Sequence, residues 1–248
     1  MRIFFFGNNR LGSRIAEWLV SEGYPIVGAC LHPAESRKSG DSLEMALSGV
    51  PIYCATSLEQ PCTVQAIVDL KPSIGLSVLF GYVLQPVLLR VFEKGCLNLH
   101  PSLLPYNRGS FPNVWSIVDG TPAGVTIHYM DQSIDTGDIV AQVPVSVEPV
   151  DTGHSLYQKL ETVAFDLFRQ TWPKLVSGTA PRVPQPAGAA PRRKRDVLAV
   201  DRIDLDRTYT ARELINILRA RTFPPYDGAY FEQEGRRVYL DLHLRYGA

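Results

Sequence analysis

The sequence has no excess of charge of either sign. Its 248 residues include 25 lysines and arginines and 25 aspartates and glutamates, so the formal net charge is zero. Proteins that bind nucleic acid by neutralising phosphates usually carry a basic excess. The composition therefore argues against a nucleic-acid partner, although it leaves room for a local basic patch.

Cysteine is scarce, and long apolar runs are missing. No two cysteines have the close spacing of metal ligands; they are Cys30, Cys54, Cys62 and Cys96. No apolar run approaches the ~20 residues of a membrane-spanning helix. The chain enters a strand-like run at residue 3 with no secretory leader before it. We expect a cytoplasmic protein with reduced thiols, no bound metal and no membrane contact.

What the sequence does contain is the pattern of an α/β fold. Residues 3–6 and 25–30 are continuous apolar runs, typical of strands buried on both faces, and the residues between them have apolar positions at helical spacing. A strand, a helix and a strand in this order predict parallel pairing with a right-handed crossover. Residues 125–130 and 139–147 indicate antiparallel additions. We predict a Rossmann-like domain with a mostly parallel sheet.

The end of the chain differs in composition. Residues 179–191 are rich in proline, alanine and glycine, which indicates a linker or an extended strap. Beyond them, a capping box starting at Thr210 predicts a helix, and two alternating runs around Gly235 predict a β-hairpin. We divide the chain into a catalytic domain, residues 1–180, and a linker with a small helix-plus-hairpin module, residues 181–248.

The loop after the first strand invites a dinucleotide-binding interpretation, which we reject. Asn9 stands where a glycine would admit the pyrophosphate, and no acidic residue ends the second strand. The start of the following helix is still a place where an anion can bind, with Arg10 beside it. A solvated Arg10 is the alternative.

One central stretch collects the side chains with the clearest chemistry. Asn98 and His100 end a strand-like run, and Pro101 keeps His100 out of helical geometry. On an extended backbone both side chains project to one side. Asp135 lies in the loop after the next strand-like run, where Gly137 permits a tight turn. If the two strands are neighbours, Asp135 can reach the imidazole.

This combination suits acyl transfer to an amine. An imidazole held by a carboxylate, beside an amide donor, can move a proton while an oxyanion is stabilised. No serine or cysteine nucleophile is needed, because the amine itself attacks. A single histidine is more often structural, and only the combination with Asn98 and Asp135 favours catalysis by His100. His128 alternates along a strand and is interpreted as structural.

Four blocks follow one another in the chain: NLHPSLLP at residues 98–105, RG at 108–109, GVTIH at 124–128 and DTGDI at 135–139. The ordered set resembles the 10-formyltetrahydrofolate-dependent formyltransferase family, and the resemblance covers most of the first 180 residues. It implies that Asn98, His100 and Asp135 are the catalytic trio. His100 would polarise the formyl oxygen, Asp135 would orient the imidazole, and Asn98 would donate to the oxyanion.

The resemblance also implies a folate pocket and an acceptor site. In the family, the loop after the strand-like run 73–80 lines the folate pocket, partly through backbone groups. The candidates for binding the co-substrate 10-formyltetrahydrofolate are Val78, Leu79, Phe80, Gly81, Tyr82, Met130 and Asp131. The substrate-binding candidates before the C-terminal module are Arg10, Pro101, Ser102 and Arg108.

The tail suggests which amine is formylated. Its motif LRARTFPPYDGAYF, residues 218–231, looks like that of sugar N-formyltransferases acting on nucleotide-linked 4-amino-4,6-dideoxy sugars. Phe223 and Tyr226 would form a rigid wall for a sugar or a base, and Arg219 or Arg221 would meet a diphosphate. Alternatively, this segment only packs the tail onto the catalytic domain. By analogy we expect a dTDP carrier and a role in lipopolysaccharide or glycan biosynthesis.

Other assignments stay open. The acceptor could be methionyl-tRNA or glycinamide ribonucleotide, although the tail is short and neutral for the first and unnecessary for the second. A folate- or sugar-nucleotide-binding module without activity is the non-enzymatic alternative, against which the intact trio argues. A homodimer formed through the C-terminal hairpin is compatible with the sequence.

Overall fold

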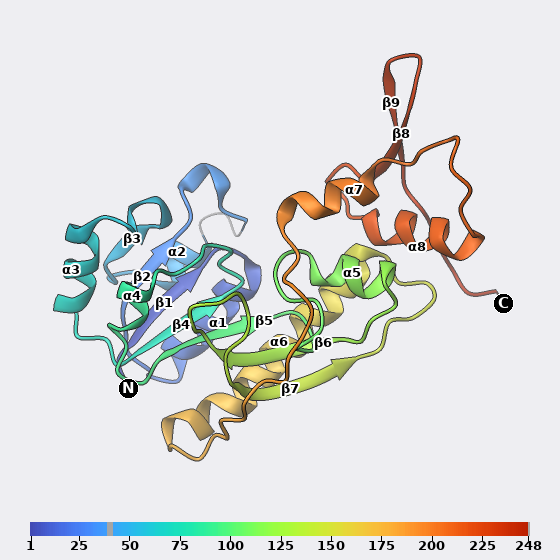
Figure 1. Cartoon of the computed structure of the whole chain (residues 1–248). Coiled ribbons are helices and arrows are strands. Elements are labelled where there is room, and N and C mark those ends of the chain that lie inside the picture. Colours follow the sequence, from blue (N-terminus) through green and yellow to red (C-terminus); the bar gives the residue numbers. More distant parts are fainter. Residues whose placement is uncertain (39–41, 248) are drawn as a thin grey trace. The chain divides into compact units, whose positions relative to one another are not determined.

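The computed structural model describes residues 1–38 and 42–247 (Figure 1). Within these residues, seven strands form one sheet in the order β3-β2-β1-β4-β5-β6-β7. The pairs from β3 to β5 are parallel, and β6 pairs antiparallel with β5. The predicted mostly parallel sheet is confirmed. Its strands are β1 (Ile3–Gly7), β2 (Ile26–Leu31), β3 (Ile52–Cys54), β4 (Ile74–Val78), β5 (Cys96–His100), β6 (Ala123–Tyr129) and β7 (Ile139–Val145).

Helices connect and cover the strands. They are α1 (Arg10–Ser21), α2 (Ser42–Ala46), α3 (Pro61–Asp69), α4 (Pro86–Leu89), α5 (Pro112–Val118), α6 (Gly153–Val176), α7 (Leu198–Asp201) and α8 (Ala211–Arg221), with short 3-10 turns at Ala34–Ser36, Ala55–Ser57 and Lys194–Val197. Asn9 caps α1, because its Oδ1 accepts the Gly12 N–H at 3.0 Å. The cap uses a donor that an anion would otherwise take.

The described chain forms two compact units whose segments alternate along the sequence. The first comprises residues 1–100, 126–142 and 164–185, and the second comprises 101–125, 143–163 and the described residues from 186 onward. The division after residue 180 stays a prediction.

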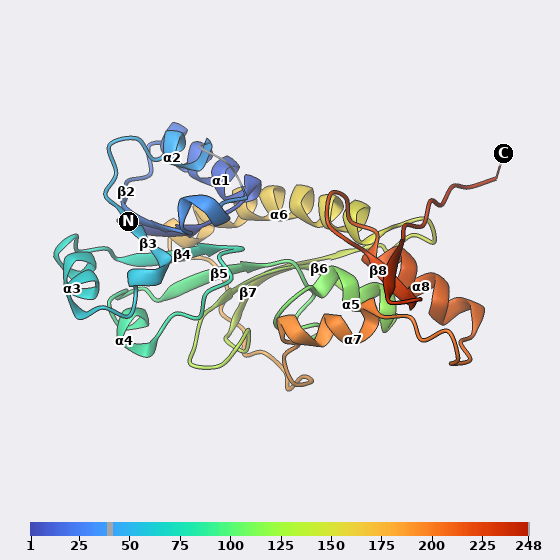
Figure 2. The ribbon, with the colours of Figure 1, turned by 90° about the horizontal axis from the view of Figure 1, so that it is seen from above.

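In the first unit, helices lie on both faces of the sheet (Figure 2). Phe4 and Phe6 belong to a buried cluster that also contains Cys96 and residues of α3 and α4. On the other face, Trp18 of α1 meets Phe168 of α6 edge-on, with ring centroids 5.8 Å apart. Because side chains alternate along a strand, the face of β5 that carries Cys96 also carries the polar residues two and four positions further on.

The second unit contains the C-terminal module. α8 begins at the predicted capping box: Thr210 Oγ1 accepts the Glu213 N–H, and the Glu213 carboxylate accepts the Thr210 N–H. The hairpin joins β8 (Ala229–Gln233) to β9 (Arg236–Leu240). Its turn residues, Glu234 and Gly235, both have positive φ, as a tight hairpin turn requires. The predicted helix-plus-hairpin module is confirmed.

Asp151 fastens the start of α6 within the second unit. Its buried carboxylate accepts hydrogen bonds from Lys159 Nζ at 2.7 Å, from the Glu148 N–H at 2.7 Å and from Ser155 Oγ at 2.9 Å. Burial alone would raise the pKa of Asp151, but these donors outweigh it and lower the pKa below its ordinary value. The charged form of Asp151 therefore stabilises the fold.

We expect Asp151→Asn to lower the free energy of unfolding by about 2 kcal/mol at pH 7, the scale of hydrogen bonds to a charged group. Because the folded-state pKa is lowered, the stabilisation is present above pH of about 4 and is lost as pH falls through the folded-state value. Urea unfolding at several pH values would show the two proteins converging in acid. Asp166→Asn, at an exposed position of α6, is the matched control. A stability gap that did not change with pH would contradict the assignment.

Residues 1–38 and 42–247 contain neither a membrane-spanning helix nor a metal-binding cluster of side chains. None of the helices in these ranges has the length and apolar character needed to cross a membrane. Nor do these ranges contain a group of three or more His, Cys, Asp or Glu side chains placed to hold a metal ion.

Candidate active site

The antiparallel register of β5 and β6 assembles the site in the first unit. Asn98 lies opposite His128, and His100 lies opposite Thr126. Opposite residues in an antiparallel pair project to the same face, so these four side chains form one polar surface. The sequence predicted that Asn98 and His100 share a side, and the register adds the two β6 residues to it.

Asp135 is delivered onto this surface by the loop between β6 and β7. Its carboxylate Oδ2 lies 3.7 Å from His100 Nε2, and its Oδ1 lies 3.5 Å from His128 Nε2. Asn98 Nδ2 donates to Oδ1 at 3.3 Å. The structure thus brings together the three residues proposed as the catalytic trio. The 3.7 Å separation is longer than a hydrogen bond, as catalytic pairs often are before substrate binds.

His128 lies inside the site, which the sequence did not predict. It is 1% exposed, so the alternation that made it a buried strand residue was correct. Its Nδ1 must carry a proton, because it donates to the Tyr129 carbonyl at 2.8 Å. In the neutral ring Nε2 then accepts from Asn98 Nδ2 at 3.2 Å. The signal for this role was the position of His128 opposite Asn98, which only the strand register gives.

The contacts of Asn98 define what the site can do. Its Nδ2 has two N–H groups, which serve Asp135 and His128. For Asn98 to stabilise an oxyanion, one of these bonds must be released when substrate binds. His100 is buried beside the Asp135 carboxylate. A negative charge at this distance favours the positively charged form of an imidazole. The arrangement can therefore hold and transfer a proton.

Cys96, two residues before Asn98 on the same strand, is not a candidate nucleophile. Its thiol is buried and lies 3.6 Å from the Met130 sulfur. Burial raises the pKa of Cys96, which keeps it protonated and unreactive. Met130 packs against the buried cluster and donates its N–H to the Cys96 carbonyl at 2.7 Å. As a folate-binding candidate it therefore offers mainly apolar contact.

The loop after β4 has an unusual backbone conformation. Leu79 and Gly81 have φ of 47° and 77°, so the chain turns sharply twice. Val78 and Phe80 are fully buried, whereas Tyr82 is partly exposed. Imidazole Nε2 of His32 is hydrogen-bonded to the Phe80 carbonyl. Of the five candidates at the end of β4 and in this loop, Val78 and Phe80 can therefore meet a ligand only through backbone atoms.

Asp131 has a bracing position in its loop. Its Oδ1 accepts from Thr136 Oγ1 at 2.6 Å and from the Ser133 N–H at 2.9 Å. Contact with a folate would use the other carboxylate oxygen. Asp138, the last residue of the loop, pairs with Arg182 at 2.7 Å.

The substrate-binding candidates belong to both units of the described chain. Arg10 is exposed at the start of α1 in the first unit. Pro101 and Ser102 follow His100 in sequence and belong to the second unit, where Ser102 is fully buried. Arg108 is buried there as well, and its Nη2 donates to the Pro186 carbonyl at 3.1 Å.

Phe223 and Tyr226 lie in an aromatic cluster of the second unit. The Phe223 ring is 4.9 Å from His154, 5.5 Å from Tyr157 and 5.8 Å from Tyr226, measured between centroids. Tyr226 is 56% exposed, so part of the cluster faces solvent. A flat ligand could stack on this exposed edge.

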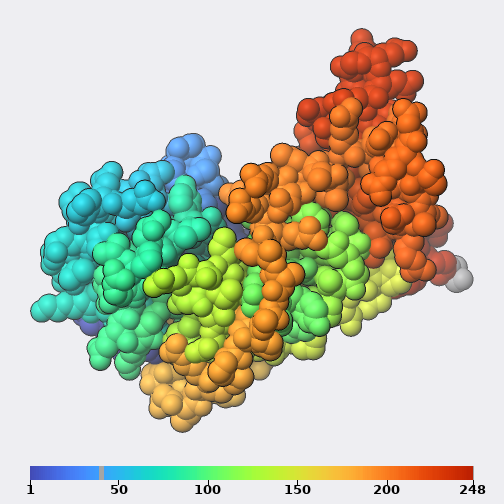
Figure 3. Space-filling model, viewed as in Figure 1, coloured from blue at the N-terminus to red at the C-terminus, as the bar shows by residue number. Residues whose placement is uncertain are grey.

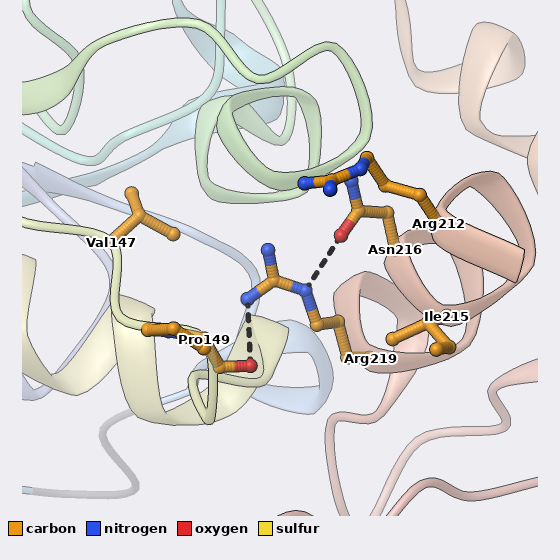
Figure 4. Close-up of a pocket in the computed structure, with 6 residues that line it drawn as sticks. All are labelled: Val147, Pro149, Arg212, Ile215, Asn216 and Arg219. Carbon is orange, nitrogen blue, oxygen red and sulfur yellow. Dashed lines mark hydrogen bonds between the residues drawn. The ribbon is translucent and has the colours of Figure 1, made fainter.

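The two arginines expected to meet a diphosphate are held by the protein itself. Arg221 forms an ion pair with Asp201. Arg219 donates to the carbonyls of Glu148 and Asp151 and to Asn216. It is one of the residues lining a pocket of about 410 Å³. Figure 4 shows its guanidinium pointing from α8 toward Pro149. These bonds use Nε and Nη1 of Arg219 and Nε and Nη2 of Arg221, so a diphosphate contact that keeps them would use the other N–H groups of each guanidinium.

Comparison with known families gives two matches. Residues 32–171 match the model of the formyl transferase family, which is more than half of the chain. Residues 196–246 match the N-formyltransferase dimerization C-terminal domain. The two matches together include β5, the loop with Asp135, α8 and the hairpin.

Individual proteins agree with these matches. The methionyl-tRNA formyltransferase of Bacillus pumilus is 31% identical over an alignment that covers 96% of this chain and 76% of that protein. The crystal structure of a 4-N formyltransferase from Francisella tularensis is 29% identical, with a TM-score of 0.83, covering 99% of this chain and 98% of that one. PseJ from Anoxybacillus kamchatkensis, in complex with UDP-4,6-dideoxy-4-formamido-L-AltNAc and tetrahydrofolate, is 27% identical, with a TM-score of 0.59, covering 80% of this chain and 89% of that one.

Proposed function

Because the chain belongs to the formyl transferase family, we propose that it moves a formyl group from 10-formyltetrahydrofolate to the amine of a nucleotide-linked amino sugar. It is an N-formyltransferase. Within that activity we assign the acceptor as a 4-amino-4,6-dideoxyhexose, with dTDP as the carrier. PseJ, whose complex holds tetrahydrofolate and a 4-formamido sugar nucleotide, supports both the donor and the acceptor class.

The proposed mechanism uses the trio directly. The uncharged amine of the sugar attacks the formyl carbon, a new C–N bond forms, and the formyl oxygen becomes an oxyanion. His100 and Asn98 donate to that oxygen while Asp135 holds the imidazole. The bond between the formyl carbon and the folate N10 then breaks. The attacking nitrogen loses one proton, and N10 leaves with one proton. The products are tetrahydrofolate and an N-formyl sugar.

The observation that carries the acceptor assignment is the extent of the structural match. The chain and the Francisella tularensis 4-N formyltransferase correspond over nearly the whole length of both. The zero net charge points the same way, because tRNA binding favours a basic surface.

Methionyl-tRNA is the second candidate acceptor, and the identity with the Bacillus pumilus enzyme favours it. We also propose that the chain forms a homodimer through its C-terminal module, since residues 196–246 match a dimerization domain. Tyr239 on β9 is partly exposed and lies against Tyr230, which places aromatic surface on the hairpin.

A turnover assay with 10-formyltetrahydrofolate would decide between acceptors. We expect tetrahydrofolate release only with a nucleotide-linked 4-amino sugar. The panel contains dTDP-, UDP- and GDP-linked amino sugars, glycinamide ribonucleotide and methionyl-tRNA, with His100→Asn as the blank. Turnover with methionyl-tRNA alone would keep the formyl chemistry and overturn the sugar assignment. If none of the acceptors supported turnover while the protein still bound folate tightly, the chain would be a binding module.

A further inference from the structure

The extended strap after α6 contacts the loop that carries Asp135. Arg182 Nε donates to Asp138 Oδ2 at 2.7 Å, and its guanidinium lies 4.1 Å from the centre of the Tyr129 ring. Val183 exchanges two backbone hydrogen bonds with Ile139, at 2.7 and 2.9 Å. Figure 3 shows the strap, in yellow-orange to orange, on the surface. The strap thus pairs with the first residue of β7 through its backbone, and it is more than a connection between elements.

Gln185 extends these contacts to the catalytic end of the loop. Its Nε2 donates to the Asp135 carbonyl at 3.2 Å and to the Gly137 carbonyl at 3.0 Å. A carboxamide nitrogen has two hydrogens, so one side chain can serve both carbonyls. Pro186 restricts the backbone of Gln185, the residue before it, to extended conformations, and Pro184 has a fixed φ of its own. Both restrictions lower the entropy lost in making the two bonds.

The loop needs such support at this point. Asp135 has a φ of 53°, a left-handed conformation that few non-glycine residues adopt and that the surrounding contacts must hold in place. The contacts of Asp131 with Ser133 and Thr136 brace the loop only up to the residue after Asp135. The Gln185 amide binds the carbonyl of the left-handed residue, Asp135, and the carbonyl of Gly137, two residues further on. It thereby fixes the direction of the Asp135 side chain.

We propose that Gln185 is a positioning residue for catalysis, which keeps the Asp135 carboxylate on Asn98, His100 and His128. The proposal rests on the role of Asp135 in the proposed function. Gln185 does not touch the reacting atoms. It acts through the backbone of the loop, and its loss would release the carboxylate while the trio itself stays intact in sequence.

Gln185→Met tests the proposal, because it keeps the length of the side chain and removes both donors. We expect kcat to fall by about 10²-fold, the scale for a misplaced catalytic group, with KM for both substrates unchanged. Gln170→Met makes the same chemical change at an exposed position of α6 and should leave kcat at the wild-type value. Gln185→Glu, which replaces the donor by an acceptor facing two carbonyls, is the second variant if the first does not fold.

A titration separates positioning from stability, and it needs no substrate. In protein labelled at its five histidines, the His100 imidazole signal is identified by its loss in His100→Asn. Removing a nearby carboxylate lowers the pH midpoint of an imidazole titration. We expect Gln185→Met to shift the His100 midpoint in the same direction as Asp135→Asn. A lower melting temperature with an unchanged midpoint and kcat would overturn the proposal. Because no acceptor is present, failure of the sugar assignment would not affect this result.

Discussion

His100→Asn is expected to lower kcat by about 10²- to 10⁴-fold, the contribution of a positioned acid or base. The imidazole is 8% exposed and faces the Asp135 carboxylate, so water cannot easily take over its role. Asparagine keeps a polar side chain of similar bulk but cannot exchange a proton near neutral pH. Initial rates of tetrahydrofolate release at saturating substrates would measure the loss.

Two companion variants make this result specific. His243→Asn changes an exposed histidine near the C-terminus and should leave kcat unchanged. Asp135→Asn should produce a loss of the same order as His100→Asn. Because the two residues act as a unit, the double variant should be little worse than either single one. Additive losses, or a His100→Asn variant with near wild-type kcat, would contradict the assignment of the trio.

The fold could be predicted because its signals are local. The apolar run at β1, the helical spacing in α1 and the capping box at Thr210 each depend on neighbouring residues, and each has the predicted structure. β3 was not predicted, because its three residues alternate between exposed and half-buried and carry no continuous apolar pattern.

The site was predicted only as far as its motifs reach. Asn98, His100 and Asp135 lie in blocks that the sequence identifies, and the structure brings them together. His128 was interpreted as structural and Gln185 was not singled out, both for the same reason. The contact of His128 with Asn98 depends on strand register, and the contact of Gln185 with the loop depends on where a proline-rich strap runs. Neither contact can be predicted from the spacing of residues along the chain.

Gly137→Ala is expected to lower kcat by about 10²-fold, because it displaces the loop that carries the carboxylate. A Cβ at residue 137 would lie 1.9 Å from the Tyr129 carbonyl oxygen, far inside contact distance. That carbonyl also accepts the His128 Nδ1 proton. The added methyl therefore disturbs both Asp135 and His128. Overpacking of this kind also costs about 1–3 kcal/mol of stability.

The control for Gly137→Ala is a glycine that has room. A Cβ at Gly12, in α1, would make only ordinary contacts, the nearest at 3.6 Å from Asn9 Oδ1. Since alanine is favoured over glycine within a helix by up to about 1 kcal/mol, Gly12→Ala should keep kcat and hold or raise the melting temperature. If Gly137→Ala lost stability but kept kcat, the loop would be able to move away from Tyr129 without moving the carboxylate. Loss of kcat in a variant that is still folded would instead show that the reaction depends on the close approach of the loop to β6.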